Sequence, residues 1–400
     1  MLIGAGRRRR RNRGYRVMAQ SEEGSAGRKG ASSQADGLAA RIGRFARERI
    51  RGHDDLRQPG NLSRDLWQDM AAEGFLGLGA PAGCGGLGAV PAVQVAAAEA
   101  LARGGRNLGL TVAWQGHNAL TRFFFDRFGS PEQRRRWLPE LAAGRVSPAV
   151  AISEPGAGAH PKHLRTEARP ENGGWILNGQ KAYVTNGAMA GVYVLLAITE
   201  VSAGRKRYTA FLLPRETPGL TLNDSGALDA LHPVTHCGLR LEGCRLGADA
   251  VLGAPGTAYE TMAGPLRDHE DLLQVGTLVG GMLAVLDLLG EEAARGALTL
   301  SDEDIEIVGM MAARAASVRA LGRAALETAE QGESGTALLL AGRRLLADFL
   351  ADLDRLPLGP GLPQVLADLR RDLGVLGGIA RQAARLRLRR LGEAALRGLD

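Results

Sequence analysis

The chain has 400 residues, 45% of them hydrophobic, and a formal net charge of +7. This composition excludes a disordered chain, and the length allows two or three domains with cores of their own. A membrane span needs roughly 20 consecutive apolar residues. The most apolar stretch, residues 272–289, is interrupted by Gln274 and Asp287, so we expect no membrane span.

The positive charge is concentrated at the start of the chain. Residues 1–18 contain seven arginines and no acidic residue, whereas the rest of the chain is electrically balanced. We expect residues 1–35 to form a basic, disordered arm; alternatively, translation starts at Met18 and the seven arginines are absent from the mature protein. An arginine-rich start without acids also fits an organellar presequence. Since Tyr15 is the only aromatic residue beside these arginines, we expect no nucleic-acid binding, and the cytoplasm is the expected location.

The cysteine and histidine positions predict neither a disulfide framework nor a metal site. Cys84, Cys237 and Cys244 are odd in number and widely spaced, which indicates a reducing compartment. His160 and His163 have a spacing that could bind a metal, but no cysteine or acidic residue accompanies them at a matching spacing. We therefore expect no bound metal.

Hydrophobic periodicity divides the chain into three regions. In residues 36–145, apolar residues such as Leu38 and Ile42 recur at helical spacing, interrupted by a glycine-rich loop at residues 80–88. Residues 146–255 change to the pattern of strands, and residues 256–400 return to a helical pattern. We expect an α+β protein with an N-terminal helical domain, a middle antiparallel β domain and a C-terminal helical domain.

Local signals predict individual elements. Asn178-Gly179 lies between the strand-like segments 175–177 and 183–185 and is typical of a tight hairpin. Further strands are expected at residues 192–198, 208–213 and 220–222. Pro131 predicts the start of a helix, and Ser301 with Asp304 predicts a capping box. The C-terminal helices are expected at residues 272–289, 304–330, 337–353 and 367–396.

The segment 151–160 combines small residues with a hydroxyl group. Gly156, Ala157 and Gly158 allow main-chain N–H groups to converge on an anion, and Ser153 adds a hydroxyl donor. Such a loop suits a pyrophosphate or the edge of a flavin ring. An ordinary Pro-Gly loop has the same composition, so this segment alone does not decide between the two interpretations.

A second segment, residues 177–187, makes the first more informative. The two segments, at their observed interval, resemble the paired flavin-binding motifs of the acyl-CoA dehydrogenase family. The resemblance extends upstream to residues 66–78, 85–88, 99 and 128–142. It covers about residues 36–289, and several motifs in the same order are far more specific than any one of them.

The resemblance implies a fold and a cofactor. The fold would consist of an N-terminal helical domain, a middle antiparallel β-barrel and a C-terminal helical bundle. FAD would lie between the β domain and the helices. Ile152 and Ser153 would contact the edge of its flavin ring, and Gly158 and Ala159 would contact its phosphates. Tyr183 and Thr185 would contact the face of the ring.

The resemblance also implies α,β-dehydrogenation of an acyl-CoA, with electrons passed to an acceptor of the electron-transfer flavoprotein type. Most family members carry the catalytic base near the C-terminus, where this chain has no matching segment. A subset carries it on the first helix after the β domain, and Asp268-His269-Glu270-Asp271 aligns with that place. Glu270 is therefore the candidate base, and Asp268 and Ala159 are candidate substrate contacts. Alternatively, Glu270 is an ordinary acidic residue near a helix start, where carboxylates are common.

Departures from the family pattern keep two other functions open. Ala159-His160 replaces Ser-Asp, and Asp271 replaces an arginine, which would weaken CoA binding and raise the pKa of Glu270. A family scaffold without catalytic activity, or a flavin-dependent monooxygenase of the same fold, would tolerate these changes. The leucine-rich stretch 338–346 would leave a large apolar patch on a monomer, so we expect a homodimer or homotetramer.

Overall fold

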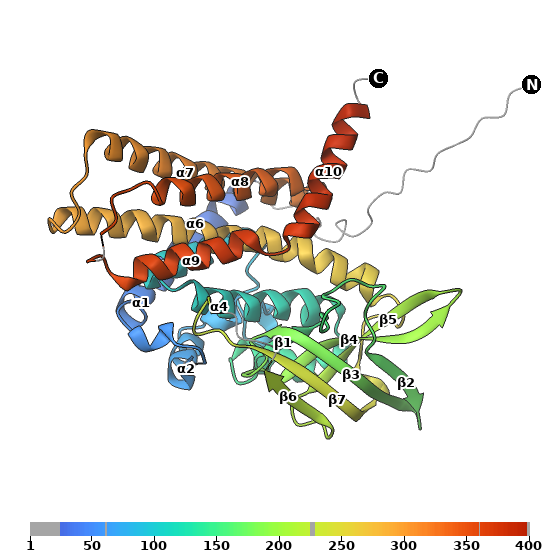
Figure 1. The fold of residues 1–400 in the computed structure, drawn as a ribbon. Helices are drawn as coiled ribbons and strands as arrows, with labels where there is room; N and C mark the ends of the chain where they lie inside the picture. Colours follow the sequence, from blue (N-terminus) through green and yellow to red (C-terminus); the bar gives the residue numbers. More distant parts are fainter. Residues whose placement is uncertain (1–24, 61, 225–228, 360, 398–400) are drawn as a thin grey trace, which may run out of the picture.

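The structure is a computed structural model that describes residues 25–397, apart from residues 61, 225–228 and 360. The arginine-rich residues 1–18 lie outside the described residues. Residues 25–35, which we expect in the basic arm, form the beginning of the first helix, α1 (Ser25–Arg49). Figure 1 shows the helical elements on one side of the molecule and the sheet on the other.

Five helices form the N-terminal region: α1, α2 (Arg64–Ala72), α3 (Pro91–Gly105), α4 (Leu108–Leu120) and α5 (Pro131–Ala142). Proline stands in the first turn of α3 and of α5, where its missing N–H has no helical partner to lose. The predicted start at Pro131 is confirmed, and Ser130 with Gln133 forms a capping box before it. Phe75 and Trp114 are fully buried in the core between these helices.

The middle region is an eight-stranded sheet. Its strands are β1 (Pro148–Ala151), β2 (Glu167–Glu171), β3 (Gly174–Thr185), β4 (Val192–Ser202), β5 (Arg205–Pro214), β6 (Leu220–Asp224), β7 (His236–Gly247) and β8 (Val251–Leu252). The order is β6-β7-β3-β2-β4-β5-β8, with β1 beside β4. The prediction of an antiparallel barrel is not confirmed, because β1 and β2 both run parallel to β4 and β6 does not pair with β8 among the described residues.

The predicted hairpin at Asn178-Gly179 is wrong. The two segments that flank it belong to one strand, β3, which pairs with β7 from Gly174 to Thr185. Gly179, with a φ of +148°, lies at a shift in register, where the partner strand β7 has one extra residue. The turn between β2 and β3 is instead made by Asn172 and Gly173, both with positive φ. Long-range pairing with β7 thus overrides a local turn signal.

The C-terminal region contains α6 (Gly264–Ala294), preceded by a π-helical turn (Tyr259–Ala263), and then α7 (Asp302–Glu330), α8 (Thr336–Leu353), α9 (Gln364–Gly378) and α10 (Arg381–Arg397). The predicted capping box of Ser301 and Asp304 is confirmed. The prediction of one helix over residues 367–396 is wrong, because Ala380 has a φ of +55° and separates α9 from α10. Figure 1 shows α10 leaving the bundle at this break.

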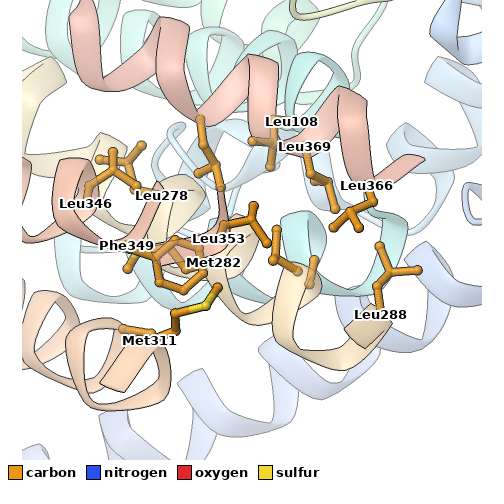
Figure 2. Close-up of a cluster of buried hydrophobic side chains, with 14 of the residues drawn as sticks. Leu108, Leu278, Met282, Leu288, Met311, Leu346, Phe349, Leu353, Leu366 and Leu369 are labelled. Atoms are coloured by element: carbon orange, nitrogen blue, oxygen red, sulfur yellow. The ribbon is translucent and has the colours of Figure 1, made fainter. Parts of the chain in front are cut away.

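The central element of the C-terminal region is α6, which contacts α3, α7 and α9. Figure 2 shows Leu278, Met282 and Leu288 of α6 packed among buried side chains of α7, α8 and α9. Among the described residues, Tyr259–Ala294 is long and apolar enough to cross a membrane, yet 78% of its most apolar window is buried within the protein. Such burial is typical of the central helix of a folded core.

Two glycines of α6 allow close contact with α3. A Cβ atom on Gly276 would lie 2.1 Å from the carbonyl oxygen of Val95, and one on Gly280 would lie 2.5 Å from that of Glu99. These backbone atoms cannot move away as a flexible side chain could. Because residues four apart share one face of a helix, the two glycines form a narrow contact surface against α3.

We expect Gly276→Ala to lower the free energy of unfolding by about 1–3 kcal/mol, because the added methyl group forces α3 and α6 apart. Gly290→Ala is the matched control, since Gly290 lies on the same helix with open space around it. The control should raise stability by about 0.5–1 kcal/mol through helix propensity. Urea denaturation of both variants measures the difference, and equal stabilities would contradict the proposed contact.

Candidate active site

A cavity of about 250 Å³ lies between the helices and the sheet. α4 and α6 form its helical wall, the end of α9 closes one side, and Thr185 and His236 at the ends of β3 and β7 belong to the opposite wall. Asn186 joins the walls, because its side-chain Nδ2 donates to the carbonyl oxygen of Ala113 on α4 at 2.9 Å. Glu270 enters the cavity from α6. The enclosure is large enough for a small organic group.

Glu270, the candidate base, is an acidic residue of the cavity lining. The residue lines the cavity and is exposed, and no described residue forms a hydrogen bond with its carboxylate. Burial raises the pKa of Glu270 to about 7; the Arg267 guanidinium opposes this rise and the Asp271 carboxylate adds to it. A carboxylate with a pKa near neutrality can both accept and release a proton at physiological pH.

Asp271, the neighbour of Glu270, holds a cluster of arginines. Its carboxylate accepts hydrogen bonds from Arg267 at 2.9 Å, from Arg343 at 2.8 Å and from Arg387 at 2.8 Å. These ion pairs connect α6 with α8 and with α10. Asp271 therefore serves the packing of the C-terminal helices, and its charge reaches Glu270 only through space.

The candidate substrate contact Asp268 does not lie in this cavity. Its carboxylate pairs with Arg387 of α10, and its side chain borders a smaller hollow beside Gly335 and Thr336, at the start of α8. His269, next to it, is half-buried, and its ring packs against the ring of Phe123. The helical period explains the difference, because consecutive residues of a helix point in directions about 100° apart.

Tyr183 and Thr185 face a broad hollow of about 810 Å³ that adjoins the cavity. The two spaces share Thr185, Leu231, His236 and Ile379. The register of β3 with β7 shifts between Lys181 and Val184, and Tyr183 has a φ of +57°. This bulge turns the ring of Tyr183 outward, so that 60% of the side chain is exposed. Burial lowers the pKa of His236, which keeps its ring uncharged at neutral pH.

Ile152 and Ser153 lie beside the same strand. The backbone oxygen of Ser153 accepts a hydrogen bond from the Ala182 N–H at 2.9 Å, one residue from Tyr183. The Lys181 ammonium donates to the backbone oxygen of Ile152 at 3.1 Å and to Glu154 at 2.9 Å. The structure thus brings these two predicted residues next to Tyr183, although neither lines the cavity that contains Glu270.

The buried pair of Glu154 and Lys181 was not predicted. Glu154 also accepts hydrogen bonds from the backbone N–H groups of Arg165 and Thr166, at 2.6 and 3.0 Å. Burial lowers the pKa of Lys181 to about 8, an effect that Glu154 opposes. The sequence signal that could have predicted this pair is one charged residue of opposite sign in each of the two flavin-like segments. The pair fixes the first segment against β3.

Gly158 and Ala159 lie farther from the cavity. Gly158 closes a tight turn with Glu154, has a φ of +54° and has open space where a side chain would point. Ala159 is exposed, and its carbonyl oxygen accepts a hydrogen bond from the Tyr259 hydroxyl at 3.2 Å. The structure therefore leaves Gly158 outside the cavity and does not bring Ala159 to Glu270. Cavity residues that the sequence reasoning missed are Gln115, Asn186, His236, Arg267, Gln274 and Ile379.

Comparison with protein families identifies the first two regions. Residues 32–145 match the N-terminal domain of acyl-CoA dehydrogenases, and residues 149–244 match their middle domain. Together the two segments account for more than half of the chain. Glu270 lies beyond both of them.

Individual relatives agree with this result. The chain is 31% identical over 250 residues to a mitochondrial isovaleryl-CoA dehydrogenase of Oryza sativa subsp. japonica, a match that covers 62% of this chain and 60% of the relative. A structure of PigA with FAD and proline has a TM-score of 0.78 at 22% identity, and the match covers 90% of this chain and 97% of the PigA chain. Butyryl-CoA dehydrogenase from Megasphaera elsdenii has a TM-score of 0.75 at 20% identity, covering 92% and 98%. The chain belongs to the acyl-CoA dehydrogenase family.

Proposed function

We propose that the protein is an FAD-dependent enzyme that dehydrogenates an acyl-CoA thioester between its α and β carbons. The observation that carries this proposal is the carboxylate of Glu270, which faces an enclosed cavity with no hydrogen-bond partner among the described residues and has a pKa raised to about 7. Membership of the family adds support. The matched segment spans 60% of the isovaleryl-CoA dehydrogenase, so the activity itself is our inference.

The described residues suit FAD. Tyr183 presents an exposed aromatic side chain to the hollow of about 810 Å³, and Thr185 and His236 lie where this hollow meets the cavity. Arg381 also lines the hollow and forms no ion pair with any described residue, so its charge is free for an anionic group such as a phosphate. Bound FAD would supply the acceptor for the hydride that leaves the β carbon.

The chain's own contribution is the removal of a proton. The Glu270 carboxylate would take the proton from the α carbon while the β carbon–hydrogen bond breaks with both its electrons, and a carbon–carbon double bond forms. Desolvation between α4 and α6 raises the pKa of the carboxylate and so makes it more basic. We propose that the two electrons then pass to an acceptor of the electron-transfer flavoprotein type.

Association and location stay predictions. The leucines that suggested an oligomer mostly belong to the protein's own core: Leu346 is buried, and Leu339 and Leu345 pack against the same cluster. A homodimer or homotetramer and a cytoplasmic location therefore rest on the family resemblance and on the composition. The side chains of Ile305 and Met310 on α7 are exposed and offer a surface for association.

We expect Glu270→Gln to lower the rate of flavin bleaching by an acyl-CoA about 10²- to 10⁴-fold, because the amide cannot accept the α proton. Anaerobic absorbance spectroscopy of the purified holoprotein with short, branched and long acyl-CoAs measures this rate. Glu260→Gln is the control, since Glu260 is exposed on the turn before the same helix. Unchanged bleaching in Glu270→Gln would exclude Glu270 as the base. A flavin that no thioester bleaches would favour a monooxygenase, and a protein without flavin would favour a scaffold.

We expect the kcat/KM of the wild-type protein to rise with pH through a midpoint near 7, because only the ionised form of Glu270 can act as a base. Asp271→Asn removes the adjacent negative charge and should move this midpoint to lower pH. Asp287→Asn, farther along α6 and paired with Arg103, should leave it in place. A pH–rate profile of the three proteins measures the midpoints, and an upward shift in Asp271→Asn would contradict the assignment.

A further inference from the structure

Two glutamine side chains line the cavity and have no role in the proposed proton transfer. Gln274 lies four residues after Glu270 on α6, and residues at this spacing share one face of a helix. Gln115 reaches the cavity from α4. Thr277, one turn further along α6, donates to the Gln115 Oε1 at 2.6 Å, which holds that amide beside α6.

Both amides have unused hydrogen-bonding groups. Gln274 forms no side-chain hydrogen bond with any described residue, and the Nε2 of Gln115 likewise has no partner among them. Several lining residues around these amides are apolar: Val112, Ala119, Leu120, Leu273 and Leu376. Polar groups enclosed in an apolar wall lose free energy unless a partner satisfies them. A ligand that fills this part of the cavity must supply that partner.

The position of the amides limits where the partner lies. Four residues of α-helix rise about 6 Å, which corresponds to roughly four or five carbon–carbon bonds. If Glu270 takes the proton of the α carbon, the amide of Gln274 lies beside an atom of the acyl chain that is four or five bonds beyond the α carbon. The charged lining residues near it, Arg267 and Asp271, already pair with each other. Apart from Glu270, which the proposed reaction uses as its base, the described lining residues therefore offer no unpaired charge to a charged substituent.

We propose that Gln274 and Gln115 select an acyl group that carries an uncharged hydrogen-bonding substituent, such as a hydroxyl, about four bonds beyond the α carbon. This inference rests on the proposed dehydrogenation for the place of the α carbon. Gln274 forms the hydrogen bond to the substituent, and Gln115, held by Thr277, forms the second. An acyl chain with a methyl group at that position leaves both amides without a partner.

The test compares two thioesters of equal length, 5-hydroxypentanoyl-CoA and hexanoyl-CoA, which differ by a hydroxyl in place of a methyl group. We expect the wild-type holoprotein to prefer the hydroxylated thioester in kcat/KM by roughly 10- to 100-fold, because the other thioester covers the two amides without giving them a hydrogen-bond partner. Gln274→Leu keeps a similar volume and should lose or reverse this preference. Gln115→Leu should weaken it, and Gln331→Leu, on the exposed end of α7, should leave it unchanged.

Binding to Glu270→Gln holoprotein separates this inference from the proposed function. There the Kd of each thioester is measured by calorimetry, and the same preference should hold without turnover. Equal Kd values, a preference for hexanoyl-CoA, or no binding of either thioester would overturn the inference. If both thioesters bleach the flavin at equal rates, the dehydrogenase function stands and the inference fails. If neither bleaches it but the hydroxylated one binds more tightly, the preference for a hydroxyl group stands, whereas the dehydrogenase function and the place assigned to the α carbon fail.

Discussion

The close contact between α6 and α3 is the constraint on which the site depends. Gly276 and Gly280 place α6 directly against backbone carbonyl oxygens of α3, where even a methyl group would collide. Glu270 lies on the same helix less than two turns before Gly276. A rigid helix transmits the position of its packed segment to its neighbouring turns, so this contact also determines where the carboxylate meets the cavity. The buried leucines and methionines around α6 then hold the contact in place.

The helical period places two adjacent acidic residues, Glu270 and Asp271, in different surroundings. Both residues line the cavity, but Glu270 has no partner among the described residues, whereas Asp271 is bound by three arginines of α6, α8 and α10. The arginines of this cluster are thereby paired with a residue other than the base. Burial can then dominate the pKa of Glu270. An aspartate where the family has an arginine is therefore compatible with a base at the preceding position.

The sheet side of the site depends on one irregular strand. The shift in register near Tyr183 exposes its ring toward the hollow, and the pair of Lys181 and Glu154 holds the first flavin-like segment against the same strand. An ion pair so deeply buried contributes more to a unique arrangement than to net stability, since its desolvation offsets much of its attraction. Both flavin-like segments are thus positioned by interactions within β3 and its neighbours.

The sequence by itself determined the order of helical, β and helical regions, the extents of α7 and α8 to within a few residues, and Glu270 as the candidate base. These features follow from local periodicity, from capping residues and from motifs that stay close together along the chain. Only the tertiary structure decided that Asn178-Gly179 continues a strand, that the last helix breaks at Ala380, and that Asp268 lies outside the cavity. It also brought Gln115 and Gln274 to one cavity wall. These features depend on packing between residues that are far apart in the sequence. Packing of this kind leaves no periodic pattern in the amino-acid sequence.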